Sequence, residues 1–154
     1  MDNISNIRAL AERMRRALES VPMDARPASM SAFPRGACGD ASLLLGAYLA
    51  DNGYPGFLYV CGERGKKEDG SWTSHAWLSK GGLIVDITAD QFRECFDSIV
   101  VGEASRFHKS FDIEATDLAD FRAWTGFGTI HLHTLYSGMK PDLFDNATGS
   151  RAEP

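Results

Sequence analysis

Three residues at separate places in the chain could act together on an amide bond. Cys38 is closely flanked by glycines at the start of an apolar stretch, His75 lies in a run of strand-forming residues, and Asp86 lies in a second such run. A thiolate is a nucleophile, an imidazole can take up and return a proton, and a carboxylate can orient the imidazole. These residue types, in this order, predict a cysteine enzyme with a Cys38, His75 and Asp86 triad.

Each of these residues also has a structural explanation when it is taken alone. A lone cysteine can simply pack beneath a helix, and a half-buried histidine can serve a single hydrogen bond. Cys38 differs because free N–H groups and the dipole at a helix start favour a thiolate, while Gly36 and Gly39 allow substrate to approach the backbone. Asp86 needs a partner because burial of an unpaired carboxylate is costly, and His75 is the obvious candidate.

Hydrophobic patterns predict the elements that must position these residues. Apolar residues recur at helical spacing over residues 3–20, which predicts an amphipathic first helix. Residues 41–50 are apolar almost all round, which predicts a buried helix with a left-handed Gly53 after its end. Aromatic and β-branched residues predict three strands, at 56–61, 74–79 and 83–88.

The last two of these strands are separated by Lys80, Gly81 and Gly82, a connection short enough for a β-hairpin. In a hairpin closed around the two glycines, His75 and Asp86 lie within about one residue of facing positions. The predicted hairpin therefore permits contact between the histidine and the aspartate.

The remaining segments are predicted to connect and flank this arrangement. Three prolines in residues 21–36 predict an extended surface connection, and the glycine- and charge-rich residues 62–71 predict an exposed loop. Residues 1–145 are expected to form one domain. Four further expectations concern its last part: a strand at 98–101, a short helix at 116–124, a helix or strand at 129–139, and a disordered tail at 146–154.

A cysteine at the head of a central helix, a histidine on a following strand and an aspartate on the next strand resembles the transglutaminase-like branch of the papain-like cysteine enzymes. The resemblance covers residues 33–91. It implies an α+β fold in which a buried helix carrying Cys38 packs on an antiparallel sheet. It also implies Cys38 as nucleophile, His75 as general base and acid, and Asp86 as the residue that orients the imidazole.

Three more residues are expected to contact substrate: Arg35, Trp77 and Gln91. Papain-like enzymes often place a glutamine before the nucleophile to donate to the oxyanion, but this chain has none there. The backbone N–H of Cys38 is therefore expected to donate, with help from Arg35 or a tryptophan. Gln91 is expected to border the cleft, although it has a second explanation as a cap of the turn after the strand. Asp40 is expected to stabilise the helix start.

Composition limits what the chain can bind and where it can work. Of its 154 residues 44% are hydrophobic, enough for one core, and its net charge of −5 argues against binding to nucleic acid or acidic membranes. The sequence has no membrane-spanning run and a polar start, so we expect a cytoplasmic protein. The odd, widely spaced Cys38, Cys61 and Cys95 predict reduced thiols. No cofactor is expected.

The predicted reaction is acyl transfer on a peptide or protein amide through a thioester on Cys38. Water as acceptor would make a peptidase, amidase or deamidase, and an amine acceptor would make a transglutaminase; the sequence leaves both open. One alternative is a noncatalytic binding module that keeps the fold. Another is a metal site, made either by Cys38, His75 and Asp86 or by the pair His131 and His133, which two ligands alone do not complete.

Overall fold

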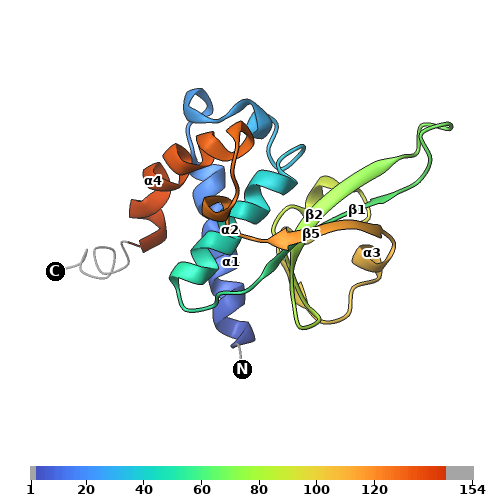
Figure 1. Ribbon diagram of the computed structural model, residues 1–154, viewed down its shortest axis with the longest axis horizontal. Coiled ribbons are helices and arrows are strands. Elements are labelled where there is room, and N and C mark those ends of the chain that lie inside the picture. Colours follow the sequence, from blue (N-terminus) through green and yellow to red (C-terminus); the bar gives the residue numbers. More distant parts are fainter. Residues whose placement is uncertain (1–2, 145–154) are drawn as a thin grey trace.

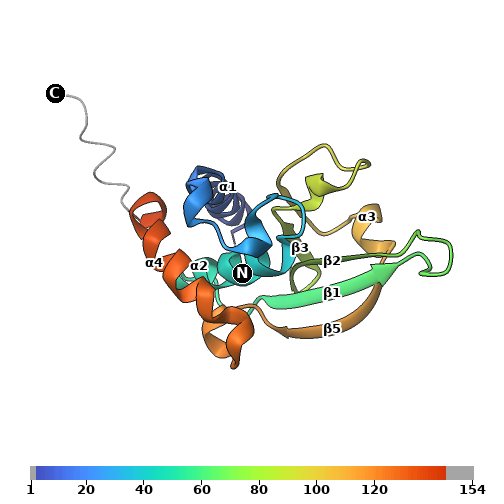
Figure 2. The ribbon, with the colours of Figure 1, turned by 90° about the horizontal axis from the view of Figure 1, so that it is seen from above.

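The computed structural model describes residues 3–144, so the tail predicted at 146–154 lies outside the described residues. The described chain folds into four α-helices and one five-stranded antiparallel sheet. The helices at residues 4–20, 38–51 and 130–144 gather at one end of the molecule, and the long strands extend away from them, with the short helix at 106–109 beside the strands (Figures 1 and 2). The elements, in chain order, are α1 (Ile4–Ser20), α2 (Cys38–Asp51), β1 (Leu58–Arg64), β2 (Thr73–Lys80), β3 (Leu83–Asp86), β4 (Val100–Gly102), α3 (Arg106–Lys109), β5 (Asp112–Leu118) and α4 (Ile130–Phe144). The predicted α+β class is confirmed.

The first helix follows its hydrophobic pattern closely. Asn3 caps α1, because its side chain accepts a hydrogen bond from the backbone N–H of Asn6. One face of the helix is buried against α2 and α4, at Ile7, Ala11, Met14, Arg15, Ala17 and Leu18. The amphipathic helix predicted for this segment is confirmed.

α2 is the buried central helix of the fold. Every residue from Ala41 to Leu49 is buried, and the chain leaves the helix through Gly53 at φ +93°, as predicted. The helix begins at Cys38, with Ala37 as a cap that offers no side-chain acceptor. The cysteine therefore occupies the first turn of the helix, where backbone N–H groups are free of helical partners.

The sheet has the order β4-β3-β2-β1-β5. The predicted hairpin between β2 and β3 is confirmed, since Leu78 faces Val85 and Lys80 faces Leu83 across it. β1 continues to Arg64, where it pairs with the first residues of β2. The loop predicted at 62–71 is therefore wrong for its first three residues, because pairing with β2 keeps the glycine- and charge-rich chain extended.

Two predictions for the connecting segments are wrong. Residues 116–124 do not form a helix, because residues up to Leu118 belong to β5 and pair with the open edge of β1. Only Phe121–Ala123 forms a helical turn, of the 3₁₀ type. Residues 21–36 are not extended but form two 3₁₀ turns, each preceded by a proline whose fixed φ suits the start of a turn.

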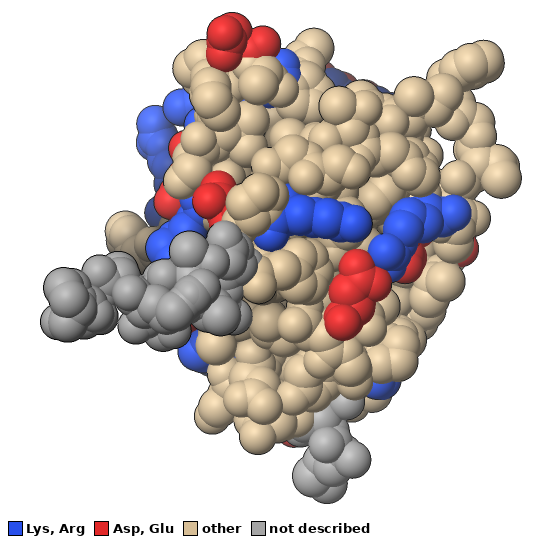
Figure 3. Space-filling model, turned by 90° about the vertical axis from the view of Figure 1, so that its left-hand side faces the viewer, with Lys and Arg blue, Asp and Glu red and all other residues tan. Residues whose placement is uncertain are grey.

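The last part of the described chain settles the remaining alternatives. The segment expected at 98–101 forms β4 slightly later, and the segment at 129–139 is the helix α4. On the helical face seen in Figure 3, basic and acidic side chains are interspersed in a mainly uncharged surface. No helix within residues 3–144 has the length and apolar character needed to cross a membrane.

Close contact between α2 and the chain after β5 allows a test of how the cysteine helix is held. An added Cβ at Gly46 would lie 1.6 Å from the backbone oxygen of Ala119, whereas one at Gly138 in α4 meets nothing within 4 Å. We expect Gly46→Ala to lower the free energy of unfolding by about 3 kcal/mol or more, because the obstacle is backbone. Gly138→Ala should raise it by about 0.5–1 kcal/mol. Urea denaturation of both variants measures the difference, and equal effects would contradict this packing.

Candidate functional site

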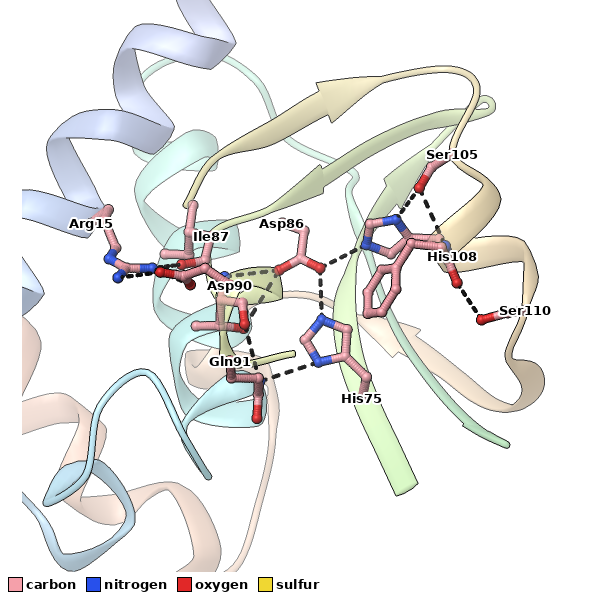
Figure 4. A network of polar contacts seen from close by, with 11 residues as sticks. Arg15, His75, Asp86, Ile87, Asp90, Gln91, Ser105, His108 and Ser110 are labelled. Atoms are coloured by element: carbon pink, nitrogen blue, oxygen red, sulfur yellow. Dashed lines mark hydrogen bonds and ion pairs between the residues drawn. The ribbon is translucent and has the colours of Figure 1, made fainter. Parts of the chain in front are cut away.

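The carboxylate of Asp86, at the end of β3, is the centre of a buried polar group. The Nε2 atoms of His75 and His108 each lie 2.6 Å from Asp86 Oδ2, and the backbone N–H of Thr88 donates to Oδ1 at 2.9 Å. The carboxyl side chain is 1% exposed. Figure 4 shows the two imidazoles approaching the carboxylate from different sides. The structure thus brings His75 and Asp86 together, as the hairpin permitted, and adds a second histidine.

The hairpin and the chain that leaves it explain how His75 and Asp86 meet. The β2–β3 ladder ends where Leu78 faces Val85, so Asp86 comes directly after the last paired residue of β3 and His75 lies three residues before that of β2. Asp86 pairs instead with Val100 of β4, which holds the backbone of Asp86 at the side of β3 that faces away from β2. The carboxylate is then free to turn toward His75, with the Thr88 N–H closing a local turn over its other oxygen.

His108 is the site residue that the sequence analysis missed. Ser105 caps the short α3, because its Oγ accepts the backbone N–H of His108 at 3.2 Å and also lies 2.5 Å from His108 Nδ1. A serine hydroxyl that donates to Nδ1 leaves the proton of the imidazole on Nε2, toward Asp86. The only local signal was the Ser-to-His cap spacing, and nothing in it points to a carboxylate 22 residues earlier.

Aromatic rings enclose His75. Ring centroids within 6.0 Å of it belong to Trp77, Phe92, Phe107 and Phe111. On β1, Gly62 lies opposite His75 of β2. It makes room for this cluster, since an added Cβ would lie 2.9 Å from Phe111 Cβ. Trp77, which we expected to contact substrate, is 3% exposed and packs edge-on against His108. The dry surroundings strengthen the interaction of His75 with Asp86.

Burial and pairing act in opposite directions on these two groups. Burial disfavours the protonated His75, but the contacts with Asp86 and Cys38 outweigh it and raise its pKa to about 9. Burial also disfavours ionised Asp86, but hydrogen bonds from His108 and His75 lower its pKa to about 2. The histidine stabilises the fold fully below about pH 6.5, and the aspartate does so above about pH 4. The pair therefore stabilises the fold most between these two values.

Cys38 lies beside His75 at the start of α2. Its thiol is close enough to the imidazole to raise the pKa of His75, both as a hydrogen-bond partner and through its charge. Because Nε2 faces Asp86, Nδ1 is the ring nitrogen left for the thiol. Cys38, Cys61 and Cys95 are all partly exposed, and burial raises the pKa of Cys61 and of Cys95.

Gln91 reaches the same ring nitrogen of His75 from the other side of the site. Its Nε2 lies 3.4 Å from His75 Nδ1 and donates to the backbone oxygen of Thr88 at 3.1 Å. The contact with Thr88 therefore turns the amide nitrogen, rather than the amide oxygen, toward the histidine. Arg35 is exposed, and its side chain has no hydrogen bond or ion pair within residues 3–144. The structure thus places Gln91 in the site and leaves Arg35 on the surface.

Arg15 of α1 fixes the chain between Asp86 and Gln91. Its guanidinium donates to the backbone oxygen of Ile87 at 2.7 Å and binds both carboxylate oxygens of Asp90, at 2.8 and 2.9 Å (Figure 4). Arg15 is 7% exposed, so these contacts are largely shielded from water. A two-point contact of this kind sets geometry as well as attraction. The first helix therefore takes part in positioning the site.

Asp40 and the two histidines of α4 form a different arrangement from the predicted one. Asp40 Oδ2 accepts hydrogen bonds from His131 Nε2, at 2.8 Å, and from the Ser29 hydroxyl. His133 instead packs edge-on against Phe121. Residues two apart on a helix do not share a face, so the metal pair considered for His131 and His133 is wrong. From the first turn of α2, Asp40 therefore joins this helix to α4 and to the chain before it.

Among residues 3–144, His75, Asp86 and His108 form a group that could hold a metal ion. Each offers one ligand atom, and these atoms lie within 4.8 Å of one another. Two imidazoles and a carboxylate suit zinc or iron. However, both Nε2 atoms lie at hydrogen-bond distance from the same carboxylate oxygen, and a metal would require both to be deprotonated. The observed distances fit shared protons.

Comparisons with known proteins assign no family to this arrangement. No model of a protein family matches the chain, and neither a curated protein nor a solved structure matches it significantly. Function is therefore argued from the residues of the site.

Acid unfolding tests whether His108 holds the Asp86 carboxylate. Because the folded pKa of Asp86 is lowered to about 2, its contribution to stability is lost as the pH falls toward that value. His108→Leu removes one donor, which raises this pKa. We expect a loss of about 1–3 kcal/mol at neutral pH and acid unfolding at higher pH, measured by circular dichroism.

His131→Leu is the matched control for this variant. It removes the histidine that contacts Asp40, a carboxylate less buried than Asp86. The pH midpoint of its acid unfolding should stay close to that of the parent. An unshifted midpoint in His108→Leu would contradict the proposed support of Asp86.

Proposed function

We propose that this protein is a cysteine-dependent acyl-transfer enzyme that acts on a peptide or protein amide through a thioester on Cys38. The observation that carries the proposal is the buried 2.6 Å hydrogen bond between His75 and Asp86, with a partly exposed thiol beside the histidine. The order of these residues on a helix and two consecutive strands supports the resemblance to transglutaminase-like enzymes. A papain-like fold is part of the same proposal.

The first half of the reaction forms the thioester. The Cys38 thiolate attacks the carbonyl carbon of the amide, and the carbonyl oxygen becomes an oxyanion. The carbon–nitrogen bond then breaks, and His75 gives its Nδ1 proton to the leaving amine. Asp86 holds the Nε2 proton throughout and stabilises the charged imidazole.

The second half releases the acyl group. Water or an amine gives a proton to His75 Nδ1 as it attacks the thioester, and the thiolate leaves. Water yields a carboxylic acid and an amine acceptor yields a new amide, so hydrolysis and transfer share one machinery. Gln91 borders Nδ1 and is the residue placed to contact the acceptor there. Arg35 is proposed to contact the substrate from the surface.

The main alternative is a noncatalytic module in which the same polar group only stabilises the fold. Burial distinguishes the two ideas, because the imidazole of His75 is fully buried while Cys38 keeps partial contact with solvent. A structural network has no need of an accessible thiol beside its histidine. An enzyme requires the nucleophile to be reachable and its base to be shielded from bulk water.

Selective alkylation tests the proposal without knowledge of the substrate. We expect iodoacetamide at pH 6 to modify Cys38 about tenfold or more faster than Cys61 and Cys95, because His75 can hold the thiolate as an ion pair. His75→Ala should remove most of this preference. Peptide mass spectrometry locates and times each modification.

His133→Ala provides a matched control, since His133 packs on Phe121 and not on the site. Its alkylation rates should equal those of the parent. Equally slow modification of all three cysteines in the parent would exclude an activated thiol and favour the noncatalytic module. A stoichiometric metal in the purified parent that is lost in His108→Leu would instead favour the metal site.

A further inference from the structure

Tyr59 reaches the start of the cysteine helix from the middle of the sheet. It lies on β1, between Leu78 of β2 and Asp117 of β5. Its ring packs edge-on against Trp124 at 5.2 Å, and the indole N–H of Trp124 is fixed by a 2.8 Å hydrogen bond to the Leu118 oxygen. The ring of Tyr59 is therefore held in one direction, toward α2.

The Tyr59 hydroxyl ends beside the residue that follows Cys38. A Cβ added to Gly39 would lie 3.2 Å from it, closer than such atoms usually approach. Glycine at position 39 thus leaves the space that the hydroxyl occupies. The thiol of Cys38 lies near enough for its charge to act on the tyrosine.

This hydroxyl is the one tyrosine hydroxyl without a hydrogen bond among residues 3–144. Tyr48 donates to the Leu143 oxygen, Tyr54 accepts from Asn6, and Tyr136 donates to Asp51. Tyr59 is half-buried and has no such partner in the described chain. Its pKa is raised by burial and by the charges of Cys61, Cys38 and Asp40, so it keeps its proton and remains a donor.

We propose that the Tyr59 hydroxyl donates a hydrogen bond to the oxyanion formed when Cys38 attacks a carbonyl carbon. The oxyanion is bonded to the carbon that Cys38 holds, so it must lie close to the first turn of α2. Free backbone N–H groups at that turn supply further donors. This inference rests on the proposed function and names a catalytic residue that the sequence analysis did not select.

Gln91 fits this role less well than Tyr59. Its amide nitrogen already donates to Thr88 and lies beside His75 Nδ1, where the proton has to move. The oxyanion needs a donor that is not engaged and that approaches from a different direction. Tyr59 comes from β1, whereas His75 comes from β2 and Gln91 from the chain after β3.

Two reactions of the same thiol separate oxyanion stabilisation from thiolate formation. p-Nitrophenyl acetate transfers its acetyl group to Cys38 through a tetrahedral oxyanion and releases p-nitrophenolate. Iodoacetamide alkylates the same sulfur by displacing iodide, with no oxyanion. We expect Tyr59→Phe to slow acetylation of Cys38 about 100-fold and to change alkylation less than about twofold, because one donor of this kind has an effect of that size.

Tyr54→Phe is the matched control, because it removes a hydroxyl that contacts only Asn6, and both of its rates should equal those of the parent. Gly39→Ala is a second probe: by crowding the Tyr59 hydroxyl it should slow acetylation more than alkylation. Circular dichroism verifies that each variant is folded.

Each remaining outcome would overturn a stated claim. If the parent is not acetylated at Cys38, the proposed function fails and the role of Tyr59 fails with it. If the parent is acetylated and Tyr59→Phe is acetylated equally fast, only the role of Tyr59 fails. If Tyr59→Phe slows both reactions to the same extent, the hydroxyl supports the thiolate rather than the oxyanion, and the inference is wrong.

Discussion

The structure depends on the neutralisation of one buried carboxylate. Asp86 is removed from water, and four donors compensate for that: two imidazole N–H groups, the backbone N–H of Thr88 and, at a longer distance, the Thr88 hydroxyl. Loss of any of them would leave charge or a polar atom uncompensated in an apolar site, which is costly. This requirement ties β2, β3 and α3 together, because each supplies part of the same small group.

The same requirement explains the packing around the site. Aromatic side chains from β2 and from the chain between β3 and β5 close over His75 and exclude water. Gly62 allows them to approach the sheet. At the other side of the histidine the packing ends at Cys38, which keeps partial exposure. The site is thus a buried histidine and aspartate with a partly exposed thiol beside the histidine.

Local patterns in the sequence predicted the elements whose formation depends mainly on residues close together in the chain. The periodic α1, the apolar α2 and the hairpin around Gly81 and Gly82 each have a pattern or turn that acts over a few residues. β5 was missed because all of its residues are exposed and its stability comes from pairing with β1, which is distant in sequence. Among the site residues, His75 and Asp86 could be linked through the hairpin. His108 could not, because a four-residue helix has no periodicity and its partner lies on another element.

The contacts of Arg15 limit where insertions and deletions can be tolerated in the chain. The segment between Asp86 and Gln91 is fixed to β3 at one end and to α1 by the guanidinium, so an inserted residue would displace either the carboxylate or the glutamine. The exposed turn between β1 and β2 has no such attachment to the site. Related sequences should therefore vary in length at this turn, while the spacing from Asp86 to Gln91 stays constant. That spacing would be a more durable mark of relationship than overall similarity.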